Sequence, residues 1–139
     1  MKIMVIDDDL QVLESVGEAL DIWDFDIRLY SDPKIALEAC GREQFSLVLT
    51  DLEMPDIDGM EVLRRIIALN IGLPVVLYSG NTDDRIRELA LNNGATAFMP
   101  KPLNAADFFA LLSRLGLSSY SRPIENGRTD DRTGPKDSK

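Results

Sequence analysis

Histidine is absent from this 139-residue chain, and cysteine occurs only once, as Cys40. The lack of histidine excludes an imidazole metal ligand, an imidazole general base and a phosphohistidine carried on these residues. A single cysteine cannot form a disulfide within the chain, and nothing in the cysteine content argues for an oxidising compartment. We therefore interpret Cys40 as a small apolar residue near the end of a helix.

Long apolar stretches are also missing, because no run of about 18 apolar residues occurs in the sequence. A helix needs such a run to cross a bilayer, so no membrane span is expected. The stretch from Met1 to Asp7 becomes acidic too soon for a secretory signal. We therefore expect a cytoplasmic protein that does not associate with membranes.

Basic charge is scarce, with 15 Lys and Arg against 24 Asp and Glu and a formal net charge of −9. Five of the basic and four of the acidic residues follow Leu115, so residues 1–115 carry 10 basic against 20 acidic side chains, a net charge of −10. Binding to a nucleic-acid backbone depends on clustered lysine and arginine, and a domain this acidic is a poor candidate for it. A divalent cation or a basic partner suits it better.

Apolar runs and amphipathic stretches alternate along the chain, and an apolar content of 45% suits one compact domain. The runs predict five strands, at Lys2–Ile6, Phe25–Tyr30, Phe45–Thr50, Pro74–Ser79 and Thr96–Met99. Helical spacing predicts five helices over about 10–20, 33–40, 60–67, 83–90 and 108–115, the second of them closed by Gly41. We expect a domain over 1–116 and a polar, disordered tail over 117–139.

The alternation predicts an α/β fold, a doubly wound five-stranded parallel sheet covered by five helices on its two faces. The second strand alternates apolar and polar residues, which favours an edge position. The order 2-1-3-4-5, as in flavodoxin-like folds, satisfies this and leaves the two strands that end on acids near the centre. Its switch point lies between the first and third strands, which puts Asp7, Asp8 and Asp51 in one crevice.

Ser79 and Lys101 follow the fourth and fifth strands and should join these acids at the same edge of the sheet. Close carboxylates repel one another unless a cation is present, and oxygen-only ligands suit Mg²⁺. Lysine and serine could bind a phosphoryl group, and a carboxylate beside the metal could act as a nucleophile that forms an aspartyl phosphate. Taken alone, Asp51 is more simply explained as a turn or helix-capping residue.

Four motifs follow one another along the chain: Ile6-Asp7-Asp8-Asp9, Thr50-Asp51-Leu52-Glu53-Met54-Pro55 with Gly59, Tyr78-Ser79-Gly80 and Phe98-Met99-Pro100-Lys101-Pro102. Jointly they resemble the receiver domain of two-component response regulators over residues 1 to about 116. The resemblance implies a phosphoprotein of phosphorelay signal transduction. A histidine kinase or histidine phosphotransfer protein would phosphorylate it in a Mg²⁺-dependent reaction, and the phosphorylated domain would change its output face.

The resemblance also implies roles for individual residues. Asp51 would be the phosphoacceptor, Asp8 would bind Mg²⁺ directly, Asp7 would bind it largely through water, and the backbone carbonyl of Glu53 would complete the protein ligands. Lys101 would contact the phosphoryl group.

Further residues would make the switch. Ser79 would turn inward to the phosphoryl group together with Phe98, although Phe98 is also explained as a half-buried aromatic of an edge strand. Glu53 and Asn81 would tune phosphoryl lifetime, and the Lys101-Pro102 bond would be cis.

Other classes of protein remain as alternatives. A haloacid-dehalogenase-like phosphatase would carry a second aspartate two residues after its nucleophile, where this chain has Glu53. A flavin carrier would need a hydroxyl-rich phosphate loop after the first strand, which the chain lacks, and an interaction module of the same fold would never be phosphorylated. We expect that the protein is not an enzyme and that its only reactions are Mg²⁺-dependent self-phosphorylation and autodephosphorylation. The output is expected through a downstream protein or an effector domain absent from this chain, without direct binding to nucleic acid.

Overall fold

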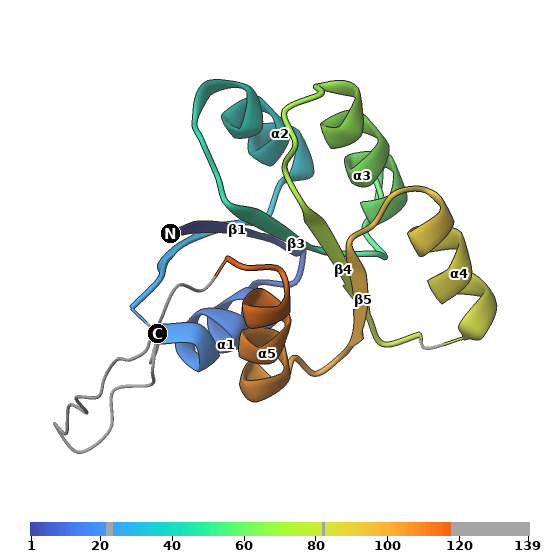
Figure 1. Cartoon of the computed structure of the whole chain (residues 1–139). Helices are drawn as coiled ribbons and strands as arrows, with labels where there is room; N and C mark the ends of the chain where they lie inside the picture. The colour runs from blue at the N-terminus through green and yellow to red at the C-terminus, as the bar shows by residue number, and fades with distance from the viewer. Residues whose placement is uncertain (22–23, 82, 118–139) are drawn as a thin grey trace, which may run out of the picture.

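The computed structural model describes residues 1–21, 24–81 and 83–117. One parallel sheet forms its centre, and its strand order β2-β1-β3-β4-β5 confirms the predicted order (Figure 1). The strands are β1 (Lys2–Ile6), β2 (Asp26–Tyr30), β3 (Leu47–Asp51), β4 (Val75–Ser79) and β5 (Ala97–Pro100). Strand β2 lies at one edge, as its alternating sequence indicated.

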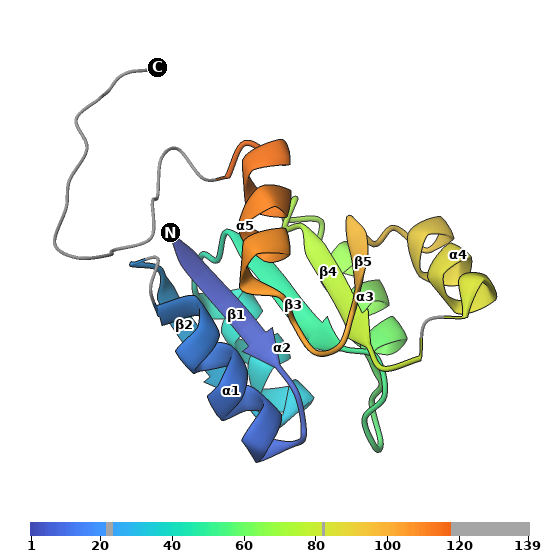
Figure 2. The same ribbon diagram turned by 90° about the horizontal axis from the view of Figure 1, so that it is seen from below.

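Helices cover both faces of this sheet. Within the described ranges they are α1 (Leu10–Leu20), α2 (Pro33–Arg42), α3 (Gly59–Ala68), α4 (Asp84–Asn92) and α5 (Ala105–Arg114). Helices α1 and α5 lie on one face and α2, α3 and α4 on the other (Figures 1 and 2). The doubly wound α/β class predicted from the sequence is therefore confirmed. None of these helices has the length and apolar character that a bilayer span requires.

Each face of the sheet has its own apolar core. Successive residues of the central strands enter opposite cores: in β3, Val48 packs on the α2–α3 side and Leu49 on the α1–α5 side. Every residue of β3 and β4 is buried. A slip of one residue in either strand would exchange the two sets of side chains, so burial fixes the register and with it the position of each strand end.

Several details differ from the expectations. Strand β3 runs from Leu47 to Asp51 and not from Phe45 to Thr50, and α5 begins at Ala105 and not near residue 108. Helix α2 continues past Gly41 to Arg42, because Gly41 does not adopt the left-handed conformation that ends a helix. Strand β5 begins and ends one residue later than predicted. In α3, Ile66 is buried while Ile67 is 48% exposed, so the apolar face is rotated by one position.

Of the predicted tail over 117–139, all but Leu117 lies outside the described residues.

The loop between β3 and α3 depends on a glycine. Gly59 donates its N–H to the Leu52 carbonyl at 2.8 Å, which folds the loop back onto the end of β3. A Cβ at this position would overlap the Asp51 carbonyl oxygen and lie 2.8 Å from Leu52 Cα. Only glycine allows so close an approach of two backbones. The position of Asp51 is therefore tied to the absence of a side chain at residue 59.

We predict that Gly59→Ala destabilises the protein by about 1–3 kcal/mol, the usual cost of an extra methyl group in a packed position. Urea-induced unfolding measures the change. Gly41→Ala is the matched control, since a Cβ there meets nothing within 4 Å and alanine is favoured in helices. It should leave the protein equally or slightly more stable. A Gly59→Ala protein as stable as the Gly41→Ala protein would contradict the close approach.

Candidate functional site

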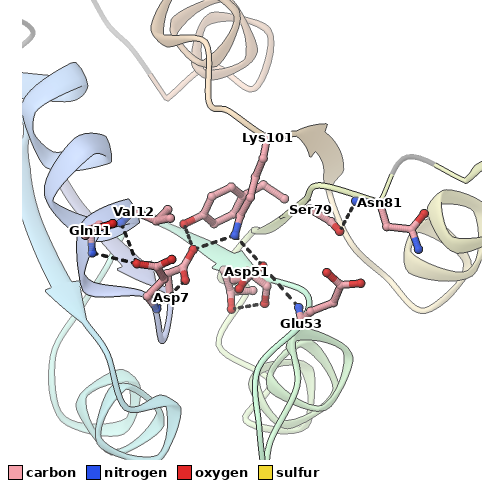
Figure 3. Close-up of polar contacts among 11 residues, drawn as sticks. Asp7, Gln11, Val12, Asp51, Glu53, Ser79, Asn81 and Lys101 are labelled. Atoms are coloured by element: carbon pink, nitrogen blue, oxygen red, sulfur yellow. Dashed lines mark hydrogen bonds and ion pairs between the residues drawn. The ribbon is translucent and has the colours of Figure 1, made fainter.

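The carboxyl ends of the parallel strands bring the predicted side chains together (Figure 3). Asp7 follows β1, Asp51 and Ser79 end β3 and β4, and Lys101 follows β5. Asp7 and Ser79 are completely buried and Asp51 is 4% exposed. Aspartate is almost never buried this deeply unless it is paired, so the partners of these carboxylates define the site.

Lys101 joins the two buried carboxylates. Its Nζ lies 3.0 Å from Asp7 Oδ2 and 3.1 Å from Asp51 Oδ1 (Figure 3). The lysine backbone is fixed as well, because Lys101 donates its N–H to the Ser79 carbonyl at 2.9 Å. The Lys101-Pro102 bond is cis, as the resemblance implied. One cation thus contacts two anions, and the pocket keeps a surplus of negative charge.

The pKa shifts follow from this arrangement. Burial raises the pKa of the Asp51 carboxyl above its usual value, the hydrogen bond from Lys101 opposes the rise, and the negative charge of Asp7 adds to it. Burial alone would lower the pKa of Lys101, but its hydrogen bonds with Asp7 and Asp51 outweigh that effect and raise it. The lysine therefore stays protonated at neutral pH, while ionised Asp51 is destabilised by its surroundings.

Three carboxylates could hold a metal ion. Asp7, Asp8 and Asp51 each offer one oxygen, and these oxygens lie within 4.8 Å of one another. Asp8 is exposed whereas the other two are buried, so one side of the cluster is open to water. Mg²⁺ prefers oxygen ligands and keeps several waters, and the donor set fits it on both counts. An added dication would also offset the surplus negative charge.

The loop after β3 lies against the same carboxylate. Glu53 donates its N–H to Asp51 Oδ1 at 3.3 Å, which places this residue at the edge of the pocket (Figure 3). Two neighbouring acids cap helices. Asp9 caps α1 by accepting the N–H groups of Gln11 and Val12, and Asp58 caps α3.

Ser79 and Asn81 are linked beside the pocket. The Asn81 N–H donates to Ser79 Oγ at 2.9 Å (Figure 3), and Asn81 Oδ1 accepts the Asp83 N–H at 3.1 Å. The serine oxygen is an acceptor here, and within the part of the chain that the structure describes no hydrogen bond uses its proton. Phe98, expected to move together with Ser79, is 7% exposed and packs in the core on the α2–α3 side.

Tyr78 also contacts the site, although its sequence position gave no reason to include it. Its hydroxyl donates to Asp7 Oδ2 at 2.7 Å, and Lys101 Nζ lies 4.9 Å from the centre of its ring. The phenol is completely buried, and burial raises its pKa, to which the hydrogen bond with Asp7 adds. The signal in the sequence is one aromatic residue with a hydroxyl group, placed between the aliphatic residues of β4 and Ser79.

The fold and these strand-end residues place a cluster of carboxylates that could hold a metal ion at the carboxyl edge of a doubly wound α/β sheet. The family model of the response regulator receiver domain matches residues 3–113. This chain therefore belongs to the response regulator receiver family. Its match to regulators argues against the phosphatase and flavin-carrier alternatives.

Curated relatives and solved structures agree with this assignment. The chain is 34% identical over 100 residues to the transcriptional regulatory protein FixJ of Bradyrhizobium diazoefficiens, covering 72% of this chain and 49% of FixJ. It is 31% identical to the transcriptional regulatory protein ZraR of Escherichia coli, covering 88% of this chain and 28% of ZraR. The chain thus spans about half or less of these relatives.

Among solved structures, the amino-terminal part of FixJ aligns with a TM-score of 0.74 at 26% identity, covering 81% of this chain and 90% of that one. A CheY-like receiver domain protein from Methanospirillum hungatei gives a TM-score of 0.74 at 26% identity, covering 82% and 91%.

We predict that Asp51→Asn is more stable than the wild type at pH 7 without divalent cations. An acid whose pKa is raised on folding binds its proton more tightly in the folded state, so stability is lost as pH rises from 3.8 through the folded value. The amide cannot ionise and escapes this loss. In thermal unfolding at pH 7 the variant should melt at a higher temperature than the wild type, by about 4 °C for each ~1 kcal/mol gained in the free energy of unfolding. The gap should narrow toward pH 4, and a variant that melts lower at pH 7 would contradict the argument.

Proposed function

We propose that this receiver domain is a phosphorylation-driven switch in which Asp51 accepts the phosphoryl group. The observation that carries the proposal is the contact of one lysine with two buried carboxylates beside an exposed third. One positive charge faces three negative ones, so the pocket has a deficit of positive charge. A divalent cation and a phosphoryl group together would use both the acidic ligands and the ammonium group.

Asp51 is the nucleophile in this proposal. One of its carboxylate oxygens attacks the phosphorus of the donor, and the bond from phosphorus to the donor's leaving group breaks, with the electron pair going to that group. Lys101 is placed to exchange its contact with Asp51 for the new phosphoryl oxygens. The Ser79 hydroxyl would turn to donate to a phosphoryl oxygen. Phe98 already lies in the core on the α2–α3 side, so its part in the switch would need no inward swing from the surface.

Asp7, Asp8, Asp51 and the backbone carbonyl of Glu53 would hold Mg²⁺. When bound, the ion supplies positive charge beside the transferred phosphoryl oxygens. Asp8 is the exposed member of the set and would bind it directly, whereas Asp7 lies deeper and would bind it largely through water. Glu53 lies at the edge of the pocket, where its side chain would govern the approach of water to the phosphoryl group. The Asn81 Oδ1 already accepts a hydrogen bond at the start of α4, so its tuning role would fall to the amide N–H groups of the same side chain.

The donor would be a histidine kinase or a histidine phosphotransfer protein, because the chain contains no histidine of its own. The output would pass to a downstream protein or to an effector domain. The acidic balance of residues 1–115 supports signalling by protein contact rather than by direct binding to nucleic acid.

Mass spectrometry of the full chain after incubation with acetyl phosphate and Mg²⁺ tests the proposal. The wild type should gain one phosphoryl mass that hydroxylamine removes, as expected of an acyl phosphate, and EDTA should prevent the gain. Asp51→Asn should gain none. Asp56→Asn is the matched control, since Asp56 lies in the adjoining loop with a positive φ that asparagine tolerates. Equal modification of Asp51→Asn and wild type would refute the assignment of Asp51.

A further inference from the structure

Tyr78 contacts two charged groups of the site, the Asp7 carboxylate and the Lys101 ammonium group. It is the register partner of Asp51 across β3 and β4, and its ring belongs to the core on the α1–α5 side. From there its hydroxyl reaches Asp7 Oδ2 on β1's carboxyl end, two strands away, at 2.7 Å. The ring also lies beneath the Lys101 ammonium group. One side chain thus links the lysine and the deepest carboxylate.

The contacts of Asp7 show what this hydroxyl does. Oδ1 accepts the Asp9 N–H at 2.9 Å, and Oδ2 accepts from Tyr78 and pairs with Lys101. The carboxylate is therefore held from both ends, and its plane cannot turn without losing a charge-assisted hydrogen bond. Its backbone is fixed too, since the Asp7 N–H donates to the Tyr30 carbonyl at 3.1 Å.

Lys101 is the partner that Asp7 has to share. The same ammonium group contacts Asp51, and in the proposed function it turns to the phosphoryl group. Asp7 is completely buried, so a lost donor on Oδ2 would leave a buried charged acceptor short of a partner, which is costly. Among the described residues, the Tyr78 hydroxyl is hydrogen-bonded to no second carboxylate, so it can stay on Oδ2 while the lysine moves.

We propose that Tyr78 is a positioning residue for the metal site, and that its hydroxyl holds the Asp7 carboxylate in the orientation that serves Mg²⁺. This inference rests on the proposed function, because it presumes that the acidic cluster binds the ion. Groups that orient metal-binding carboxylates typically contribute 10- to 100-fold to metal affinity. Tyr78 acts through Asp7 and does not touch the ion.

Tyr78→Phe isolates the hydroxyl, since phenylalanine keeps the ring in the core and beneath the ammonium group of Lys101. Isothermal titration calorimetry with MgCl₂ on the full chain measures the affinity, and thermal unfolding without metal measures stability. Tyr30→Phe is the matched control, because it removes a tyrosine hydroxyl from β2 but keeps the backbone carbonyl that Asp7 uses. We expect Tyr78→Phe to bind Mg²⁺ about tenfold more weakly and Tyr30→Phe to bind it as the wild type does.

A second readout uses proteins that retain Tyr78. Adding Mg²⁺ to the wild type or to Tyr30→Phe should give a tyrosine band in the ultraviolet difference spectrum, because the hydrogen bond to Asp7 changes as the carboxylate engages the hydrated ion. Tyr78→Phe should lack this band.

The possible results separate the two proposals. If the wild type binds Mg²⁺ and Tyr78→Phe binds it equally well, the positioning role is wrong while the metal site stands. A lower melting temperature with unchanged affinity would likewise show a purely structural hydroxyl. If the wild type binds no Mg²⁺, both the positioning role and the metal site of the proposed function are overturned.

Discussion

The site depends on one electrostatic constraint: a single ammonium group, Lys101, contacts two carboxylates that are buried from water. Two carboxylates held this close together and away from water repel each other, and the ammonium group between them offsets that repulsion. Because the ammonium group is shared, it is fully committed to neither carboxylate. A group that offers better acceptors, or a second cation that relieves the acids, can redistribute its contacts. In the proposed function, this shared charge is what would let the site respond when a phosphoryl group or a metal ion arrives.

The rest of the chain keeps these three groups in place. Two separate cores fix the register of the central strands, and the strand ends then deliver Asp7 and Asp51 to one crevice. Gly59 lets the β3–α3 loop fold against the end of β3, and the backbone bond from Lys101 to the Ser79 carbonyl anchors the lysine. Tyr78 fills the core on one side and donates to the site on the other. The residues that stabilise the carboxyl edge of the sheet are therefore also those that form or support the candidate site.

The fold and the position of the candidate site could largely be predicted from the sequence, because buried strands and helix faces show a regular pattern of apolar residues. Continuous apolar runs predicted the central strands, alternation placed β2 at the edge, and parallel strands necessarily meet at one edge with their polar ends. The bond between Tyr78 and Asp7 could not be predicted in this way, since it depends on side-chain directions across three strands. The predicted end of α2 was wrong, because this type of helix end requires a glycine with positive φ and Gly41 does not adopt one. The exposure of Ile67 depended on a small rotation of α3 that spacing alone does not determine.

The central claim is that Lys101 balances the two buried carboxylates and turns to a phosphoryl group when one arrives. The ¹³Cε resonance of Lys101, followed by NMR as the full chain is titrated first with Mg²⁺ and then with beryllofluoride as a phosphoryl mimic, tests it most directly. Two successive shifts are predicted, the first as the ion relieves the carboxylates and the second as the ammonium group contacts the mimic. A Lys101 resonance that stays constant while amides of the neighbouring loops shift would contradict the account.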